Sequence, residues 1–512
     1  MGRNILLITT DQMRYDALGC NGGEVARTPV LDGLSAAGIN YRRAHNQSVV
    51  CMPARATIMT GQHVSSHGVW MNGVPLPEDA PSIAGWLNSK GYRTALLGKA
   101  HFEPWLGAPA EFVENRMAAS GDTGPRRGFD RMELANHFFE GHSHYDRWMR
   151  SEHAQDIPGF YPMVTEEGRQ NTAGGGATGA IQVWDNPVAR ELYHTDWVAE
   201  RTLAWLGELG DQDDWFCWMS FPDPHHPWDP PASERSRVDW REVPLPSLYP
   251  GSAAQAAQML ADKPAHWRGY FDGSLWTNLE SPRGFAPMDL TADQIREINA
   301  VNHIENELID EACGRVVDWL DARGWGDTTD ILFTTDHGEL QGDYGLLFKG
   351  PYHVDALMRV PLIWRPAPAS NPVPAEVTAP VGHLDLAATC CAIAGVDCPD
   401  WIEGRPLPSS EDEAEDQQRR HVLTEWASEH GPVSIGLTSI YHADGYLLSK
   451  YHPGSVYDGS EGELYDLTED PEQRVNRWGD PALRARQRDL RALLDDSLPD
   501  ARTPRLERRA PV

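Results

Sequence analysis

The sequence predicts an α/β fold: a doubly wound, mostly parallel sheet, followed by a smaller C-terminal α+β domain around an antiparallel sheet. Short apolar runs of strand length alternate with amphipathic helical segments along most of the chain. This alternation is typical of a parallel sheet that is covered by helices on both faces. Towards the C-terminus, short strands instead follow one another with little helix between them, as they do in antiparallel sheets.

The strands of the large sheet are expected where short apolar and aromatic runs end in polar residues. These runs are residues 4–10, 40–45, 92–98, 215–221, 330–335 and 360–364. Helices are expected where apolar residues recur every three or four positions, and Thr28 before Pro29 marks one helix start. The expected helices are residues 28–34, 81–87, 193–209, 291–323 and 382–394.

Two domains are expected from the length of 512 residues and from the change of pattern after residue 408. Residues 1–408 would carry the chemistry. Within them, residues from about 103 to 189 lose regular periodicity, so they are expected to form an insertion folded over one face of the sheet. The acidic run 409–418 is the expected linker. The C-terminal domain, 409–512, would contain strands 422–425, 434–441, 446–450 and 463–467 and a helix at 481–494.

The net charge of −31 argues against a surface that binds nucleic acid or an anionic membrane. No apolar run reaches the length that spans a bilayer, and the run 4–10 is too short to be the core of a signal peptide. Seven cysteines are a sparse, odd set for this length, which is typical of reduced thiols. The sequence therefore predicts a cytoplasmic protein.

Charged side chains follow the expected strands at the points where the strands end. These residues are Asp11, Lys99, His101, His225, Asp336 and His337, and Lys349 lies in a later glycine-rich loop. In an open α/β sheet, ligand-binding groups gather beyond the carboxyl ends of the strands. Asp11, Asp336 and His337 offer oxygen and imidazole ligands for a divalent cation. The remaining cations and histidines offer positive charge and proton donors for an anionic ester.

Residues 51–55 read Cys-Met-Pro-Ala-Arg, and they open an expected helix. A proline is tolerated in the first turn of a helix, and Arg55 lies one turn after Cys51 and therefore on the same face. The helix N-terminus and Arg55 both favour negative charge beside Cys51. The pattern indicates a site for an anionic reaction centre, although a buried cysteine before an ordinary helix shows the same pattern.

Taken in order, these motifs resemble the sulfatase family of the alkaline phosphatase superfamily. The resemblance extends over nearly the whole chain. It rests on Asp11 after the first strand, the 51–55 motif with Thr60 and Gly61, Lys99 with His101, the Pro-His-His-Pro run 224–227, Asp336 to Glu339, Lys349 with Gly350, and the later motifs at 404–407 and 464–467. The resemblance implies an alkaline-phosphatase-like fold.

In that family the cysteine of the motif is converted to formylglycine, an aldehyde that hydrates to a geminal diol. The resemblance implies that Cys51 is this residue, that one hydroxyl of the diol attacks the ester, and that a formylglycine-generating enzyme acts during maturation. It also implies one divalent cation, held by Asp11, Asp336, His337 and residue 51, with Gln12 as a further candidate ligand.

The resemblance also implies roles for the surrounding side chains. Lys99 and Lys349 would bind the ester oxygens and stabilise the transition state. His225, with Lys349, would protonate the leaving alcohol, and His101 would deprotonate the hydroxyl that remains. Arg55 would hold the diol. Asn72 matches an asparagine that contacts substrate in phosphonate monoester hydrolases.

Two departures from the commonest sulfatase pattern bear on the metal and the substrate. Gln12 stands where many sulfatases have a second aspartate, and His337 stands where they have an amide. An imidazole ligand makes Mn²⁺ as plausible as Ca²⁺. The Lys99 and His101 pair favours sulfate monoesters, with an arylsulfatase-like activity. Hydrolysis of phosphonate monoesters or phosphodiesters at the same site is the alternative.

Three points stay open at this stage. A non-catalytic binder with unmodified Cys51 and a plain cysteine nucleophile are further readings of the motif. The sequence does not define the leaving group of the small anionic ester. It also leaves open whether the protein is a homo-oligomer.

Overall fold

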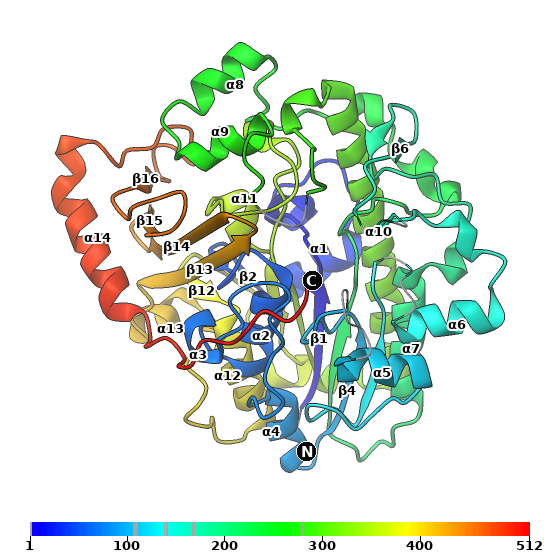
Figure 1. Ribbon diagram of the computed structural model, residues 1–512. Helices are drawn as coiled ribbons and strands as arrows, with labels where there is room; N and C mark the ends of the chain where they lie inside the picture. Colours follow the sequence, from blue (N-terminus) through cyan, green and yellow to red (C-terminus); the bar gives the residue numbers. More distant parts are fainter. Residues whose placement is uncertain are drawn as a thin grey trace.

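A large sheet crosses the centre of the computed structural model, which describes residues 3–105, 111–137, 139, 142–165, 167, 169–277 and 281–511 (Figure 1). Its spatial order is β11 (Ala375–Val377), β2 (Ile39–Tyr41), β10 (Leu362–Arg365), β9 (Thr329–Thr335), β1 (Asn4–Thr10), β8 (Trp215–Ser220), β4 (Arg93–Gly98) and β5 (Arg131–Leu134). Neighbouring strands run parallel except β10, which is antiparallel to both β9 and β2. The mostly parallel sheet is therefore confirmed.

Helices cover both faces of this sheet, and the residues of β1 alternate between the two faces. Ile5 and Leu7 belong to a core shared with α2 (Cys51–Thr60), α4 (Ile83–Ser89) and α12 (Leu384–Ala394). Leu6 and Ile8 belong to the opposite core, shared with α1 (Pro29–Ala37), α7 (His194–Gly207) and α10 (Ala292–Arg323). Both faces are buried, which explains why the strand reads as one continuous apolar run.

The longest helix, α10, has the start and end that the sequence indicates. The Thr291 hydroxyl accepts a hydrogen bond from the Gln294 backbone N–H, and the Gln294 side chain accepts one from the Thr291 backbone N–H. This capping box satisfies two N–H groups that the helix itself leaves unpaired. The helix ends at Gly324, whose φ of 79° a glycine adopts without steric cost.

The segment 103–189 contributes to the sheet as well as to the periphery. It contains α5 (Val113–Ser120), α6 (His144–Glu152) and the small hairpin of β6 (Gly174–Gly175) and β7 (Ala180–Ile181). It also contains β5, the edge strand that pairs with β4. The expected insertion is thus partly a strand of the main sheet. Its residues 106–110, 138, 140–141, 166 and 168 lie outside the described residues.

Several short elements complete the part of the chain that precedes the C-terminal sheet. They are α3 (Val64–His67), α8 (Ala253–Met259), α9 (Ala265–Phe271), α11 (Asp355–Met358) and the pair of β3 (Ala44–His45) with β12 (Val381–Gly382). Among the described residues, no helix combines the length and the apolar character required to cross a membrane.

A separate four-stranded antiparallel sheet lies towards the C-terminus, as expected. Its strands are β13 (His421–His430), β14 (Val433–His442), β15 (Tyr446–His452) and β16 (Gly462–Asp466), in sequence order. Helix α14 (Arg484–Ser497) covers one face, where Leu490 and Leu494 pack against Leu448 and its neighbours. The boundary at 408/409 stays a prediction.

The acidic run 409–418 is partly helical, and its role as a linker stays a prediction. It contains helix α13 (Glu411–Asp416), whose start is capped by the Ser410 hydroxyl. Ala414 of this helix is buried in the core that also holds α2 and α12. The helix docks on the larger part of the chain through Ala414 and through Glu411, whose carboxylate accepts from the Thr378 backbone N–H and hydroxyl.

Position 98, the last residue of β4, requires a glycine because β4 and β8 approach each other closely there. Its φ is 112°, and a Cβ atom there would lie 1.7 Å from the carbonyl oxygen of Ser220 on β8. We predict that Gly98→Ala lowers the free energy of unfolding by about 3 kcal/mol, measured by chemical denaturation. Gly33→Ala is the control, because a Cβ at this helical position meets nothing within 4 Å. Equal effects of the two substitutions would contradict the prediction.

Candidate active site

Four potential metal-binding side chains converge at the carboxyl ends of β1 and β9 and the first residue of α2. They are Asp11, Cys51, Asp336 and His337, and their ligand atoms all lie within 4.8 Å of one another. The Cys51 Sγ is 3.7 Å from Asp11 Oδ1 and 3.2 Å from His337 Nε2. The structure therefore brings together the sequence-predicted metal ligands, although they are separated by up to 326 positions along the chain.

The donor set fits a divalent cation. Two carboxylates and an imidazole are common ligands of such ions. His337 Nδ1 lies 2.9 Å from the carbonyl oxygen of Gly338, so Nδ1 carries the proton and Nε2 faces Cys51 with its lone pair. Holding the second imidazole nitrogen on a carbonyl is the usual way in which a protein orients a histidine ligand.

Arg55 joins the two carboxylates of this cluster. Its Nε donates to Asp336 Oδ2 at 2.8 Å, and its Nη2 donates to Asp11 Oδ2 at 3.3 Å. Its Nη1 donates to the carbonyl oxygen of Lys99 and to the Ser220 hydroxyl. The side chain is fully buried, so its charge is compensated by these carboxylates rather than by water.

Lys99 adds a second buried cation. Its ammonium group forms an ion pair with Asp11 Oδ2, and it lies 3.4 Å from Nδ1 of His137. Burial alone would raise the pKa of Asp11, but the charges of Lys99 and Arg55 outweigh it and hold that pKa well below its usual range. Asp11 is therefore ionised and available as a ligand.

Lys349 and His225 form a linked pair on the other side of the cluster. Lys349 Nζ is 2.9 Å from His225 Nε2 and 2.5 Å from Gln12 Oε1. His225 Nδ1 lies 2.5 Å from the carbonyl oxygen of His226, so Nδ1 carries the proton and Nε2 accepts from the Lys349 ammonium. Burial and the Lys349 charge keep the pKa of His225 well below its usual range.

Gln12 turns towards Lys349 and Glu339. Its amide oxygen accepts from Lys349, and its amide nitrogen donates to Glu339 Oε2. Its own backbone N–H donates to Asp336 Oδ1 at 3.1 Å. Gln12 thus borders the metal cluster, and its role as a ligand stays a prediction.

His101 and Asn72 also lie in this region, with contacts that the sequence did not indicate. The Trp105 indole N–H donates to His101 Nε2 at 3.1 Å, so the acceptor nitrogen of His101 is occupied by an indole. The Asn72 side-chain oxygen accepts from the Met52 backbone N–H at 2.9 Å. Asn72 therefore holds the first turn of α2, the turn that begins with Cys51.

Sequence reasoning assigned no role to two buried participants. His137 stacks on His225 with ring centroids 4.0 Å apart and also contacts Lys99. It lies in the non-periodic segment 103–189, three residues after the end of β5, a strand that the sequence did not indicate. Glu339, which holds Gln12, does follow the Asp336 motif directly, and its burial raises its pKa to about 7. The adjacency to Asp336 was the one signal that could have identified it.

The surroundings of Cys51 disfavour an ordinary thiolate nucleophile. Burial, followed by the charge of Asp11, raises the pKa of the Cys51 thiol to about 12. Every residue of α2 is buried, and Cys51 itself is 1% exposed. A cysteine that reacts as a thiolate instead lies in an electropositive, partly exposed environment.

The C-terminal tail packs beside this site. The backbone N–H groups of Arg509 and Ala510 both donate to the carbonyl oxygen of Gly73, at 2.8 and 3.3 Å. Gly73 directly follows Asn72. The tail therefore rests on the loop that holds the first turn of α2.

Comparison with known protein families agrees with this geometry. A family model described as Sulfatase matches residues 3–396. The chain belongs to the sulfatase family. A second model, described as N-sulphoglucosamine sulphohydrolase, C-terminal, matches residues 342–499. The predicted family and its class of activity, the hydrolysis of sulfuric esters, are thereby confirmed.

Individual relatives are distant but cover most of the chain. An arylsulfatase of Clostridium perfringens is 26% identical over 93% of this chain and 90% of its own length. A choline-sulfatase of Rhizobium meliloti is 25% identical over 96% of this chain and 86% of its own length. The solved phosphonate monoester hydrolase of Agrobacterium radiobacter shares the fold, with a TM-score of 0.76, 22% identity and coverage of 96% and 95% of the two chains.

Arg55 is expected to be essential for holding two carboxylates together. We predict that Arg55→Met lowers the free energy of unfolding by about 3 kcal/mol or more, because it leaves Asp11 and Asp336 buried without their shared cation. Arg505→Met is the matched control. Arg505 pairs with Glu429 at the surface, where an ion pair contributes about 1 kcal/mol or less. Similar losses for the two variants in denaturant titrations would refute this role.

Proposed function

We propose that the protein hydrolyses sulfate monoesters, with a formylglycine derived from Cys51 as its nucleophile and one divalent cation at Asp11, Asp336 and His337. The observation that carries the proposal is the placement of Cys51. It stands at the start of a buried helix, in contact with Asp11 and His337, and the charges of Lys349 and Lys99 act on it. That arrangement suits an anionic centre rather than a free thiol.

The cation, when bound, would polarise the ester and lower the pKa of the attacking hydroxyl. Asp11 and Asp336 supply negative charge for it, and Arg55 fixes their mutual position. Lys99 and Lys349 carry ammonium groups on two sides of the cluster. In this proposal both bind the non-bridging oxygens of the ester and stabilise the charge of the transition state.

Proton supply to the leaving alcohol is assigned to the Lys349 and His225 pair. The Lys349 ammonium already donates to His225 Nε2, so a proton can pass along this contact to an alkoxide that takes its place beside the two groups. The backbone carbonyl of His226 holds Nδ1 and thereby aims Nε2 at Lys349. His137 stacks on the ring and restrains it from the other side.

The remaining roles are assigned to His101 and Asn72. His101 would remove the proton from the second hydroxyl of residue 51, which releases sulfate. For this its Nε2 must exchange the Trp105 indole for the reacting hydroxyl. Asn72, which holds the Met52 N–H, would keep residue 51 in position and contact the substrate with its amide group.

The burial of α2 bears on maturation. A formylglycine-generating enzyme must reach the Cys51 side chain, and that side chain is almost completely enclosed. We therefore assign the conversion of Cys51 to a stage before α2 docks on the sheet. The choice between Ca²⁺ and Mn²⁺, a cytoplasmic location and homo-oligomerisation remain parts of the proposal that metal analysis, fractionation and light scattering can test.

The preference for sulfate can be tested against its nearest rival. We expect kcat/KM for 4-nitrophenyl sulfate to exceed that for 4-nitrophenyl phenylphosphonate, because Lys99 and His101 match the sulfatase pattern. Phosphonate hydrolysis that is faster by orders of magnitude would overturn the proposal in favour of a phosphonate monoester hydrolase. Mass spectrometry of the Cys51 peptide is the control, since unconverted protein is expected to hydrolyse neither ester.

His225 should matter most for poor leaving groups. We predict that His225→Ala lowers kcat for phenyl sulfate by about 100- to 10,000-fold, because phenolate needs the proton that Lys349 and His225 supply. The loss should be much smaller for 4-nitrophenyl sulfate, whose alcohol leaves as the anion. His452→Ala, on β15, removes an imidazole outside the site and should leave both rates unchanged. An equal loss with both esters would exclude the proton-donor role.

A further inference from the structure

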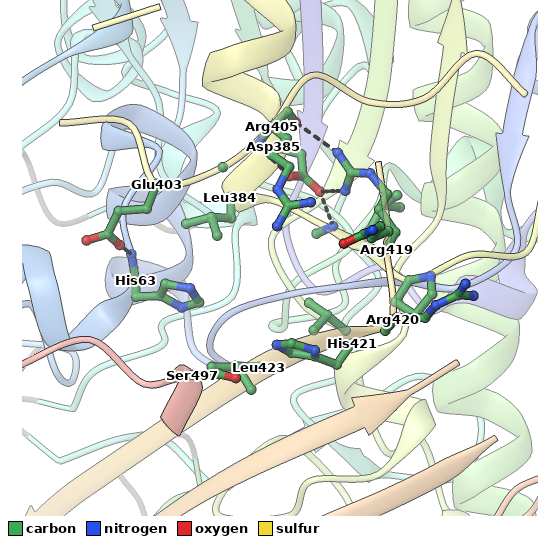
Figure 2. Close-up of a pocket in the computed structure, with 16 residues that line it drawn as sticks. His63, Leu384, Asp385, Glu403, Arg405, Arg419, Arg420, His421, Leu423 and Ser497 are labelled. Carbon is green, nitrogen blue, oxygen red and sulfur yellow. Dashed lines mark hydrogen bonds and ion pairs between the residues drawn. The ribbon is translucent and has the colours of Figure 1, made fainter. Parts of the chain in front are cut away.

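A second basic cavity lies between the larger part of the chain and the C-terminal sheet (Figure 2). Its volume is about 160 Å³, and it is bordered by the start of α12, the segments 403–405 and 418–423, His63 and Ser497. The reaction proposed above uses none of these residues. The space is several times the roughly 30 Å³ that one water molecule takes up in the liquid, so it can hold a small molecule.

Three basic side chains border the open part of this cavity. Figure 2 shows His63, Arg405 and His421 arranged around it, with Leu384 as an apolar wall. They come from three distant parts of the chain: the turn after α2, the segment after α12 and the first residue of β13. Arg405 supplies the positive charge of this group, and the two imidazoles add hydrogen-bonding nitrogens.

The two carboxylates nearby do not neutralise this group. Asp385 is paired with Arg419 at 2.7 Å, and it also accepts backbone hydrogen bonds from Gly382 and Arg405. The Glu403 carboxylate accepts from the His63 backbone N–H at 2.7 Å and from a serine hydroxyl, and Figure 2 shows it turned away from the cavity. Both carboxylates are therefore already engaged by other donors, and Arg405 Nη1 donates to the Gln417 carbonyl oxygen.

Two further observations concern the imidazoles of this cavity. Among the described residues, His63 Nδ1 is buried and has no hydrogen-bond partner. Burial, followed by the charges of His442, Arg405 and His63, lowers the pKa of His421. The lowered pKa favours the neutral imidazole of His421, and an anion bound beside it would instead favour the protonated form.

We propose that this cavity binds a small tetrahedral oxyanion, such as inorganic sulfate or phosphate, between Arg405, His63 and His421. Arginine presents parallel N–H donors that match two oxygens of such an anion, and the imidazoles supply donors from the opposite side. The anion would link the turn that follows the Cys51 helix to the first strand of the C-terminal sheet. The site is separate from the catalytic cluster, so its test does not depend on the proposed reaction.

The first test locates the anion directly in the wild-type protein. Crystals grown in selenate, an analogue of sulfate whose selenium scatters anomalously, should show a peak between Arg405 and His421. A peak there in the wild type supports the site. Anomalous density that is confined to the catalytic cluster, at concentrations that saturate it, would overturn the proposal.

The second test measures binding in solution by equilibrium dialysis with radiolabelled sulfate. Arg405→Ala and His421→Ala should each weaken one class of sites by about tenfold or more, because each removes a charge-assisted hydrogen bond. Arg488→Ala, which removes an exposed arginine of α14, is the matched control and should bind as the wild type does. Unchanged sulfate binding in folded Arg405→Ala protein would refute the site.

Two refinements complete the experiment. Arg405→Lys keeps the charge but loses the paired donors, and it replaces Arg405→Ala if that variant does not fold. Unlabelled phosphate distinguishes the two anions. Displacement of sulfate by phosphate assigns the site to either oxyanion, and no displacement assigns it to sulfate.

Discussion

The site depends on one constraint: two aspartates must remain charged and close together where water does not reach them. Asp11 and Asp336 end neighbouring strands, so the parallel register of β1 and β9 brings them side by side. Their mutual repulsion in a buried place would separate the strand ends if nothing compensated it. Arg55 spans both carboxylates, and Lys99 pairs with Asp11. The helix that presents Cys51 therefore also supplies the charge that holds the strand ends together.

The sequence indicated the main parts of this arrangement for a physical reason. A parallel sheet collects the carboxyl ends of its strands at one edge, so polar residues that follow apolar runs are expected to meet. Asp11, Asp336 and His337 could be assembled in this way without coordinates. The helix of Cys51 and Arg55 followed from local spacing. The same reasoning could not find His137, because it depends on a segment without periodicity, and it could not show that Asn72 binds the backbone of Met52.

Most of the architecture could also be predicted from the sequence. Runs of strand length and helical periodicity gave the class of fold and most element positions, because both faces of the sheet are buried. The reversal of β10 had no local signal, since an antiparallel strand in a mixed sheet has the same apolar pattern as its neighbours. The helical state of the acidic run 411–416 depends on the docking of Ala414 and on a serine cap. Composition alone made this run resemble a linker.

The path of the tail has a practical consequence for anyone who handles the protein. Arg509 and Ala510 rest on Gly73, and a Cβ at Gly73 would collide with the Ala510 carbonyl oxygen. The neighbouring Asn72 holds the turn of residue 51. Residues 509 and 510 thus brace, through Gly73 and Asn72, the turn that begins with residue 51. A substitution in this segment could therefore alter the position of residue 51 without touching the site itself.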